Sequence, residues 1–181
     1  MKDDELLEAL RRLQRRLQSE KLARYRRRVA WGDLLTERAD NASEYGFGEG
    51  TTCYDGVLVL GDVRVGRSCW IGPNVVLDGT GGLEIGDYCS ISAGVQVYTH
   101  DTVAWSSSLG RAPRRVAPTK IGAGVYLGPN TVVSMGSTIG DRCVIGAMSL
   151  VRGTIPAGSR AWGCPARVMG PTSEGPASGD A

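Results

Sequence analysis

The 181-residue chain contains a single histidine, a single phenylalanine and few aromatic side chains of any kind. One histidine excludes a zinc site built from three of them. The five cysteines form no CxxC pair, so neither a disulfide framework nor a cysteine zinc site is expected, and we interpret them as small buried hydrophobes. With aromatics at 6% of the residues, the interior must be narrow and filled by small aliphatic side chains.

Long apolar runs and a strong net charge are also lacking. No stretch has the length and polarity of a transmembrane span or signal peptide, so we expect a cytoplasmic location. A net charge of +2 gives no reason to expect nucleic acid as a partner. The charge is uneven, however: residues 1–30 hold ten Lys/Arg and five Asp/Glu (+5), and the remainder holds eleven and fourteen (−3). This predicts a basic N-terminal appendage on a mildly acidic body.

What the chain does have is 26 glycines and a six-residue rhythm of aliphatic side chains. The rhythm slips by two residues at Leu83-Glu84 and stops between Val97 and Ile121. Four residues after each aliphatic comes a mostly small residue, three of them cysteines. A period of six fits a short parallel strand plus a turn, and three such units make a triangular coil of about eighteen residues. Stacked coils would form a prism whose interior holds Val59, Val65, Ile71, Leu77, Ile85, Ile91, Val97, Ile121, Leu127, Val133, Ile139, Ile145 and Val151.

The N-terminal segment, residues 1–45, contains leucines at helical spacing: Leu6, Leu10, Leu13 and Leu17. Arginines lie largely on the other face of this predicted helix. We expect the helix to cover the end of the prism or to pack on a neighbouring subunit. Peripheral contact with anionic lipid, or with a partner protein, is an alternative for a helix of this kind. Residues 170–181 are small and polar and are predicted to form a flexible tail.

The stretch KIGAGVYLGPNTVVSMGSTIGDRCVIGAMSLVRGTIPAGSRAWGCPARV, residues 120–168, resembles the hexapeptide-repeat acyltransferases. It is similar to the C-terminal half of the maltose, galactoside and polysaccharide O-acetyltransferases, including the closing WGCPARV element. The resemblance implies that residues 46–169 form a left-handed parallel β-helix, a mainly β fold. It also implies a homotrimer without a metal, with acetyl-CoA as donor in the groove between adjacent prisms.

Residues 99–120 leave the repeat, and the only histidine, His100, stands at the first turn of this excursion. A coil interior cannot hold the arginines and prolines found here, so the segment must loop outward. The resemblance assigns His100 the catalytic role. Chemistry agrees, because a free imidazole has a pKa of roughly 6.5 and can take a proton from a sugar hydroxyl and return it to the leaving thiolate. Asp101 is a candidate to orient the imidazole or to bind sugar hydroxyls, and Arg114 and Arg115 to meet a diphosphate.

The resemblance also supplies candidate ligand contacts. Residues expected to line the pantetheine channel or meet the CoA phosphates are Tyr126, Gly128, Pro129, Ala147, Arg152 and Arg167. Tyr98 and Trp105 are candidates for stacking on the acceptor sugar, together with Asp101. Two glycines, Gly153 and Gly170, stand where relatives carry basic residues, which predicts rearranged phosphate binding.

These features predict an acetyl-CoA-dependent O-acetyltransferase acting on a sugar hydroxyl, in surface-polysaccharide or glycolipid biosynthesis. Two alternatives stay open. One is N-acetylation of a nucleotide-linked amino sugar, and the other is a β-helix scaffold without catalysis, because this fold hosts several activities.

Overall fold

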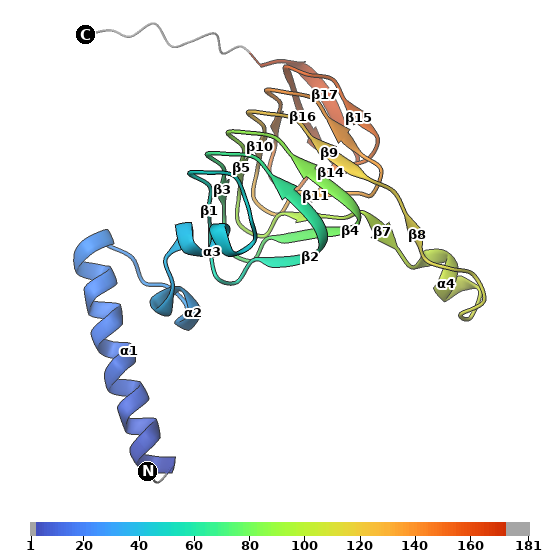
Figure 1. The fold of residues 1–181 in the computed structure, drawn as a ribbon. Helices are drawn as coiled ribbons and strands as arrows, with labels where there is room; N and C mark the ends of the chain where they lie inside the picture. Colours follow the sequence, from blue (N-terminus) through green and yellow to red (C-terminus); the bar gives the residue numbers. More distant parts are fainter. Residues whose placement is uncertain (1–2, 173–181) are drawn as a thin grey trace, which may run out of the picture.

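The computed structural model describes residues 3–172 and has the predicted architecture, a left-handed parallel β-helix preceded by helices (Figure 1). Each coil contributes short strands to three flat faces of a prism. Face 1 contains β1 (Thr52–Cys53), β3 (Trp70–Ile71), β5 (Ser90–Ile91), β10 (Tyr126–Leu127), β13 (Val144–Ile145) and β16 (Ser159–Gly163), with β17 (Ala166–Pro171) added antiparallel.

The other two faces share two long strands that turn a corner of the prism. These strands are β2 (Leu58–Val65) and β4 (Val76–Ile85). Face 2 takes their first halves, followed by β6 (Gln96–Val97), β11 (Val132–Val133) and β14 (Leu150–Val151). Face 3 takes their second halves, followed by β9 (Thr119–Ile121), β12 (Thr138–Ile139) and β15 (Thr154–Ile155). We call the edges of the prism corner 1–2 and corner 2–3 after the faces they join.

The six-residue rhythm correctly identified the inner residues of the prism. Each aliphatic lies in register with its counterpart one coil away, as in Leu127 with Ile91 and Ile145 on face 1. All thirteen aliphatics are buried except Val59, which is half-buried against the same core. The small residues four positions on are also buried, apart from the half-buried Val63. Four of the cysteines are buried as expected, but Cys164 is exposed and the prediction was wrong for it.

The outer residues differ from face to face although the inner ones are alike. On face 2 the outward column reads Leu58, Val76, Gln96, Val132 and Leu150. On face 3 it reads Arg64, Glu84, Lys120, Thr138 and Thr154, and Lys120 pairs with Glu84 at 3.1 Å. The outer surface of face 3 is therefore polar and suited to solvent exposure, whereas that of face 2 is a largely apolar strip.

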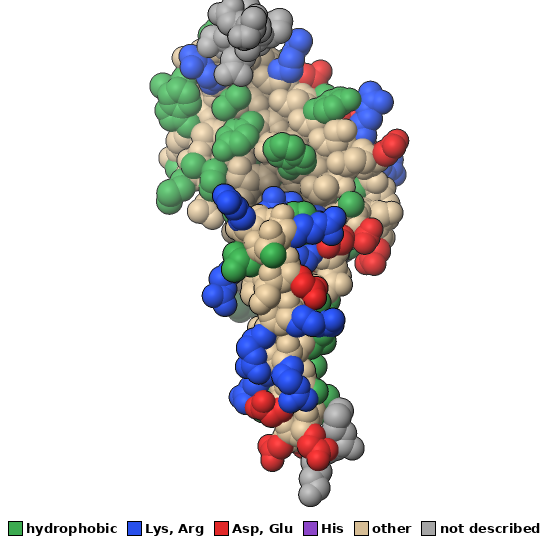
Figure 2. Space-filling model, turned by 90° about the vertical axis from the view of Figure 1, so that its left-hand side faces the viewer, with side chains coloured by type: hydrophobic (Ala, Val, Ile, Leu, Met, Phe, Trp, Pro, Cys, Tyr) green, Lys and Arg blue, Asp and Glu red, His purple; other side chains and the backbone are tan. Residues whose placement is uncertain are grey.

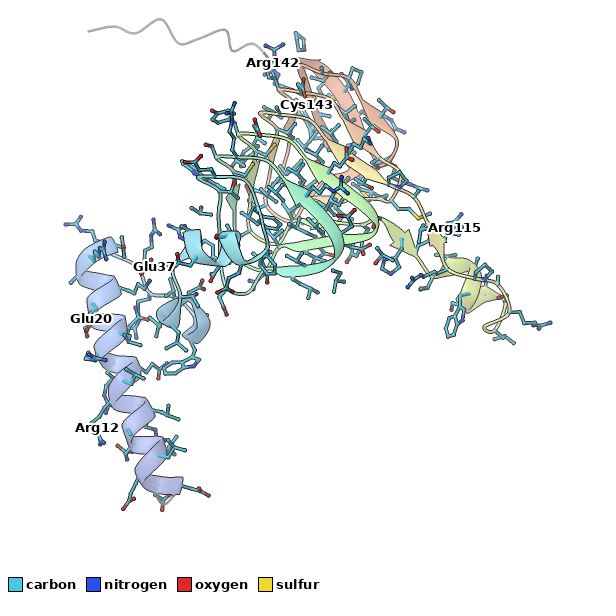
Figure 3. All side chains as sticks on the ribbon, in the orientation of Figure 1. Arg12, Glu20, Glu37, Arg115, Arg142 and Cys143 are labelled. Carbon is cyan, nitrogen blue, oxygen red and sulfur yellow. The ribbon has the colours of Figure 1, made fainter. Side chains whose placement is uncertain are left out.

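The N-terminal segment does not cover the prism with its long helix. Helix α1 (Asp3–Tyr25) has no buried residue and extends away from the coils, contacting the short helix α2 (Trp31–Leu35) (Figure 1). Lys21 of α1 pairs with Glu37, which lies between α2 and α3 (Figure 3 labels Glu37). Instead, α3 (Arg38–Glu44) and Phe47 close the first coil, where Asn41 donates a hydrogen bond to the carbonyl of Cys53. No helix among residues 3–172 has the length and apolar character needed to cross a membrane.

The predicted excursion is a projecting arm, residues 99–118. It consists of the antiparallel pair β7 (His100–Asp101) and β8 (Arg115–Val116) and, at its tip, helix α4 (Val103–Ser107) (Figure 1). At the other end of the chain, the antiparallel strand β17 extends to Pro171. Residues 173–181 of the predicted tail lie outside the described part of the chain.

Candidate functional site

Two irregularities of the coil meet at corner 2–3. In β4, three residues (Thr80, Gly81 and Gly82) stand opposite the single Asp62 of β2, because Gly61 pairs with Gly79 and Val63 with Leu83. One coil further on, the arm leaves from the same corner between β6 and β9. The bulge and the base of the arm are in direct contact, since Thr99 Oγ1 accepts a hydrogen bond from the Gly81 amide at 2.8 Å.

The bulge delivers a buried carboxylate to the only histidine. Asp78 Oδ2 lies 2.6 Å from His100 Nδ1, and the Asp78 side chain is fully buried whereas that of His100 is 26% exposed. Asp78 also accepts hydrogen bonds from the amides of Thr80 and Thr99 and from the Thr80 hydroxyl. The imidazole is therefore held at one ring nitrogen while its side chain stays partly exposed.

These hydrogen bonds fix the charge of Asp78. Burial alone would raise the pKa of Asp78, but the hydrogen bonds from Thr80, Thr99 and His100 outweigh burial and hold the pKa well below its usual value. An ionised carboxylate only accepts hydrogen bonds, so His100 Nδ1 must carry the proton that it shares with Asp78. The lone pair of neutral His100 then lies on Nε2, the nitrogen that is free to accept a proton.

His100 borders an open groove with a volume of about 760 Å³, which is within the range of small-molecule sites. The groove brings together predicted residues from separate coils: Tyr98, His100, Asp101 and Arg152. The groove is also lined by Arg115 of the arm and by Ser134, Met135, Gly136, Leu150 and Gly153 of the following coils. Sequence reasoning thus named the histidine, one aromatic, one carboxylate and two cations, Arg115 and Arg152, of a shared surface.

The structure corrects the expected partner of the imidazole. Asp101 is not hydrogen-bonded to His100; it pairs with Arg115 across the base of the arm, Oδ2 to Nη2 2.6 Å (Figure 3 labels Arg115). This guanidinium lowers the pKa of Asp101. The orienting role belongs to Asp78, which the sequence analysis missed. The available signal was the two-residue slip, which the sequence analysis placed at Leu83-Glu84 and which the structure places at the bulge Thr80–Gly82, two residues after Asp78.

Apart from Arg152, the predicted cofactor residues do not line this groove. Tyr126 is on the outer side of face 1, and Gly128, Pro129 and Ala147 form corner 1–2 in successive coils. Gly128 is closely packed there, because a Cβ added to it would lie 2.5 Å from the Ala147 nitrogen. Arg167 belongs to the final strand β17 and is exposed. Trp105 lies on α4 of the arm, 53% exposed, and does not line the groove.

Comparison with protein families gives two matches that avoid the arm. Residues 62–99 match a model described as the hexapeptide repeat of succinyl-transferase, and residues 118–153 match one described as bacterial transferase hexapeptide (six repeats). The segment between the matches is the arm without its first and last residues. The repeat is therefore shared with these transferases on both sides of the excursion that carries His100.

Individual relatives are named acetyltransferases. The chain is 31% identical over 111 residues to a probable acetyltransferase of Mycobacterium tuberculosis, covering 60% of this chain and 37% of the relative. It is 30% identical over 108 residues to the galactoside O-acetyltransferase of Escherichia coli, covering 60% and 53%. The matches thus span about half or less of these relatives. A hexapeptide-repeat acetyltransferase from Vibrio cholerae, solved with acetyl-CoA, superposes with a TM-score of 0.65 at 27% identity, covering 92% of this chain and 89% of that chain.

Proposed function

The chain is a hexapeptide-repeat protein related to the bacterial acetyltransferases, and from that premise we propose that it transfers an acetyl group from acetyl-CoA to a sugar hydroxyl. The observation that carries the proposal is the Asp78–His100 pair at the rim of the 760 Å³ groove. A buried, ionised carboxylate sets the imidazole tautomer, and the same histidine lines a space large enough for a small acceptor.

The proposed step is a direct transfer. The acceptor hydroxyl oxygen forms a bond to the thioester carbonyl carbon while its proton passes to His100 Nε2. The tetrahedral intermediate then expels the thiolate, which takes the proton back from the imidazolium. Asp78 stays ionised throughout and stabilises the imidazolium that forms between the two proton transfers. No acyl-enzyme is needed, so one histidine is sufficient.

The placement of the predicted cofactor residues supports a homotrimer. His100 and Arg152 lie at corner 2–3, whereas Tyr126, Pro129 and Ala147 lie on the other side of face 2. Both sets can meet one extended thioester when a second copy lays its corner 1–2 against corner 2–3 of the first. The apolar outer strip of face 2 lies between these corners and would be covered by such packing. We infer a ring of three copies with a site at each contact, Arg152 and Arg167 serving as phosphate anchors.

The experiment is a thiol-release assay with acetyl-CoA and a panel of mono- and oligosaccharides, hydroxyl and amino acceptors being tested in parallel. We expect hydroxyl acceptors to release CoA. Preferential turnover of amino sugars would replace the O-transfer proposal by N-transfer. If acetyl-CoA neither turns over nor raises the melting temperature, the protein is a scaffold and the proposal fails.

His100→Ala and Arg167→Ala separate chemistry from binding. We expect His100→Ala to lower kcat by roughly 10²–10⁴ with the affinity for acetyl-CoA nearly unchanged. Arg167→Ala should instead raise the KM for acetyl-CoA, because it removes a cation expected at the CoA phosphates. Steady-state kinetics at saturating acceptor distinguishes the fall in kcat from the rise in KM for acetyl-CoA. Equal loss of binding and rate in His100→Ala would point to a structural role for the histidine.

A further inference from the structure

A second groove, on face 1, has a composition that the proposed reaction does not use. Its volume is about 480 Å³, and Arg27, Arg38, Tyr54 and Trp70 line it together with Ser90 and Ser92. Trp70 is 69% exposed although it stands in a strand. A smaller cavity of about 220 Å³ adjoins it and shares Arg27, Arg38 and Tyr54. We call the larger space the face 1 groove.

The two arginines of this groove are available for an anion. Among residues 3–172, neither Arg27 nor Arg38 has a carboxylate within salt-bridge distance, and no acidic residue lines the face 1 groove. The acidic groups of the smaller cavity are already engaged: Glu37 pairs with Lys21, and Asp33 accepts from the Asp55 amide. Paired guanidinium groups are suited to phosphate oxygens, which they bind in a fork geometry.

The aromatic residues extend this cationic end along the face. Arg38 lies over the Tyr54 ring, 5.0 Å from its centroid, which fixes one guanidinium at the mouth. Thr52, Trp70 and Ser90 follow one another in register on β1, β3 and β5, about 4.8 Å apart per strand. Figure 2 shows apolar side chains gathered on the side of the prism that carries these strands, with Lys and Arg side chains below them. Cations, an exposed indole and hydroxyls therefore occur in order along one groove.

We propose that the face 1 groove binds a nucleoside diphosphate, with the diphosphate at Arg27 and Arg38 and the base stacked on Trp70. Ser90 and Ser92, beyond Trp70, would then meet the polar edge of the base, and a sugar attached to the terminal phosphate would leave the groove at its cationic end. The inference deepens the proposed function by naming the acceptor class, a nucleotide-linked sugar. It rests on that function only for the acceptor role, since nucleotide binding itself needs no catalysis.

The test is calorimetric titration of the full chain with UDP, dTDP, ADP and CoA, with uridine as the phosphate-free control. We expect at least one nucleoside diphosphate to bind and uridine to bind about tenfold more weakly or not at all. Arg38→Ala and Trp70→Ala should each weaken binding about tenfold, because they remove a charge-assisted hydrogen bond and a stacking surface. Arg64→Ala, an exposed arginine on face 3, is the matched control and should leave binding unchanged.

The outcomes distinguish the two sources of a nucleotide. If UDP or dTDP stays bound in the presence of CoA, the groove serves a nucleotide-linked acceptor. If CoA displaces UDP or dTDP, and Arg38→Ala weakens CoA binding to the same extent, the groove holds the nucleotide end of the donor instead. Binding that is unaffected by Arg38→Ala and Trp70→Ala, or no binding of any nucleotide, overturns the proposal. His100→Ala should bind the nucleotide like the wild type. A protein without acetyl transfer that still binds UDP would refute the proposed function and keep this inference.

Discussion

Corner 1–2 and corner 2–3 belong to the same prism and follow opposite rules. At corner 1–2, from β3 to β14, each face 1 strand is separated from the following face 2 strand by four residues. The third residue of each of these four-residue turns has a left-handed φ: Asn74, Gly94, Asn130 and Met148. At corner 2–3, the spacing changes from coil to coil through the β4 bulge and the arm. The regular corner repeats the same four-residue turn in each coil, which keeps the strands of successive coils in register. The irregular corner places Asp78 and His100 together, which no repeated unit could do.

Replacing Asp78 should have the largest effect on the irregular corner. In Asp78→Asn the side-chain amide can donate to Nδ1, which would leave the proton on Nε2 and remove the base. We expect kcat to fall by roughly 10²–10⁴, measured by thiol release. Asp62→Asn, an exposed acid of the same corner, is the control and should retain wild-type turnover. An active Asp78→Asn enzyme would mean that the carboxylate does not set the tautomer.

The regular corner should respond in stability. Leu127, which directly precedes the corner residue Gly128, is fully buried between Ile91 and Ile145. Leu127→Ala leaves a cavity among them, and we expect the free energy of unfolding to fall by about 2–5 kcal/mol. Urea denaturation at one fixed protein concentration measures this. A loss below about 1 kcal/mol would show that the coils relax to fill the space, contrary to a rigid stack.

The two outer strips can be compared by adding one charge to each. Val132→Arg places a cation on face 2, where the proposed neighbour would bury it, whereas Thr138→Arg places one on face 3, beside Lys120. Burying an unpaired charge is strongly unfavourable. We therefore expect Val132→Arg to shift sedimentation toward the monomer and Thr138→Arg to leave the mass unchanged. Equal behaviour of the two variants would contradict face 2 as the contact surface.

The smallest effect is the pH dependence that Asp78 contributes to stability. Its folded pKa is lowered, so its contribution is fully present above the ordinary carboxyl pKa of about 3.9 and is lost as pH falls toward the folded value. Stability should therefore fall more steeply from pH 5 to pH 3 in the wild type than in Asp78→Asn. Urea unfolding at both pH values checks this, and parallel slopes would contradict an ionised Asp78.

The candidate site was predictable in part. The break in the rhythm and the only histidine coincide at His100, and Tyr98 and Arg152 line the same groove, while the roles predicted for these residues stay predictions. Asp101, next to His100 in sequence, was named as a candidate to orient the imidazole and Asp78 was not considered, but the β7–β8 pairing directs Asp101 to Arg115 instead. Proximity along the chain says little about a coil in which contacts join residues about one turn apart. Asp78 and His100 are twenty-two residues apart.

The sequence by itself determined the prism, because a six-residue period of aliphatics buries its side chains in only one kind of stack. It also determined where the chain leaves the stack. Only the tertiary structure decided that the slip and the excursion share a corner, that the long helix leaves the prism uncovered, and which faces are apolar outside. The physical reason is that the buried aliphatics follow a short period that can be read along the sequence. The hydrogen bonds of Asp78 depend instead on how many residues each coil has in its turns at the corners.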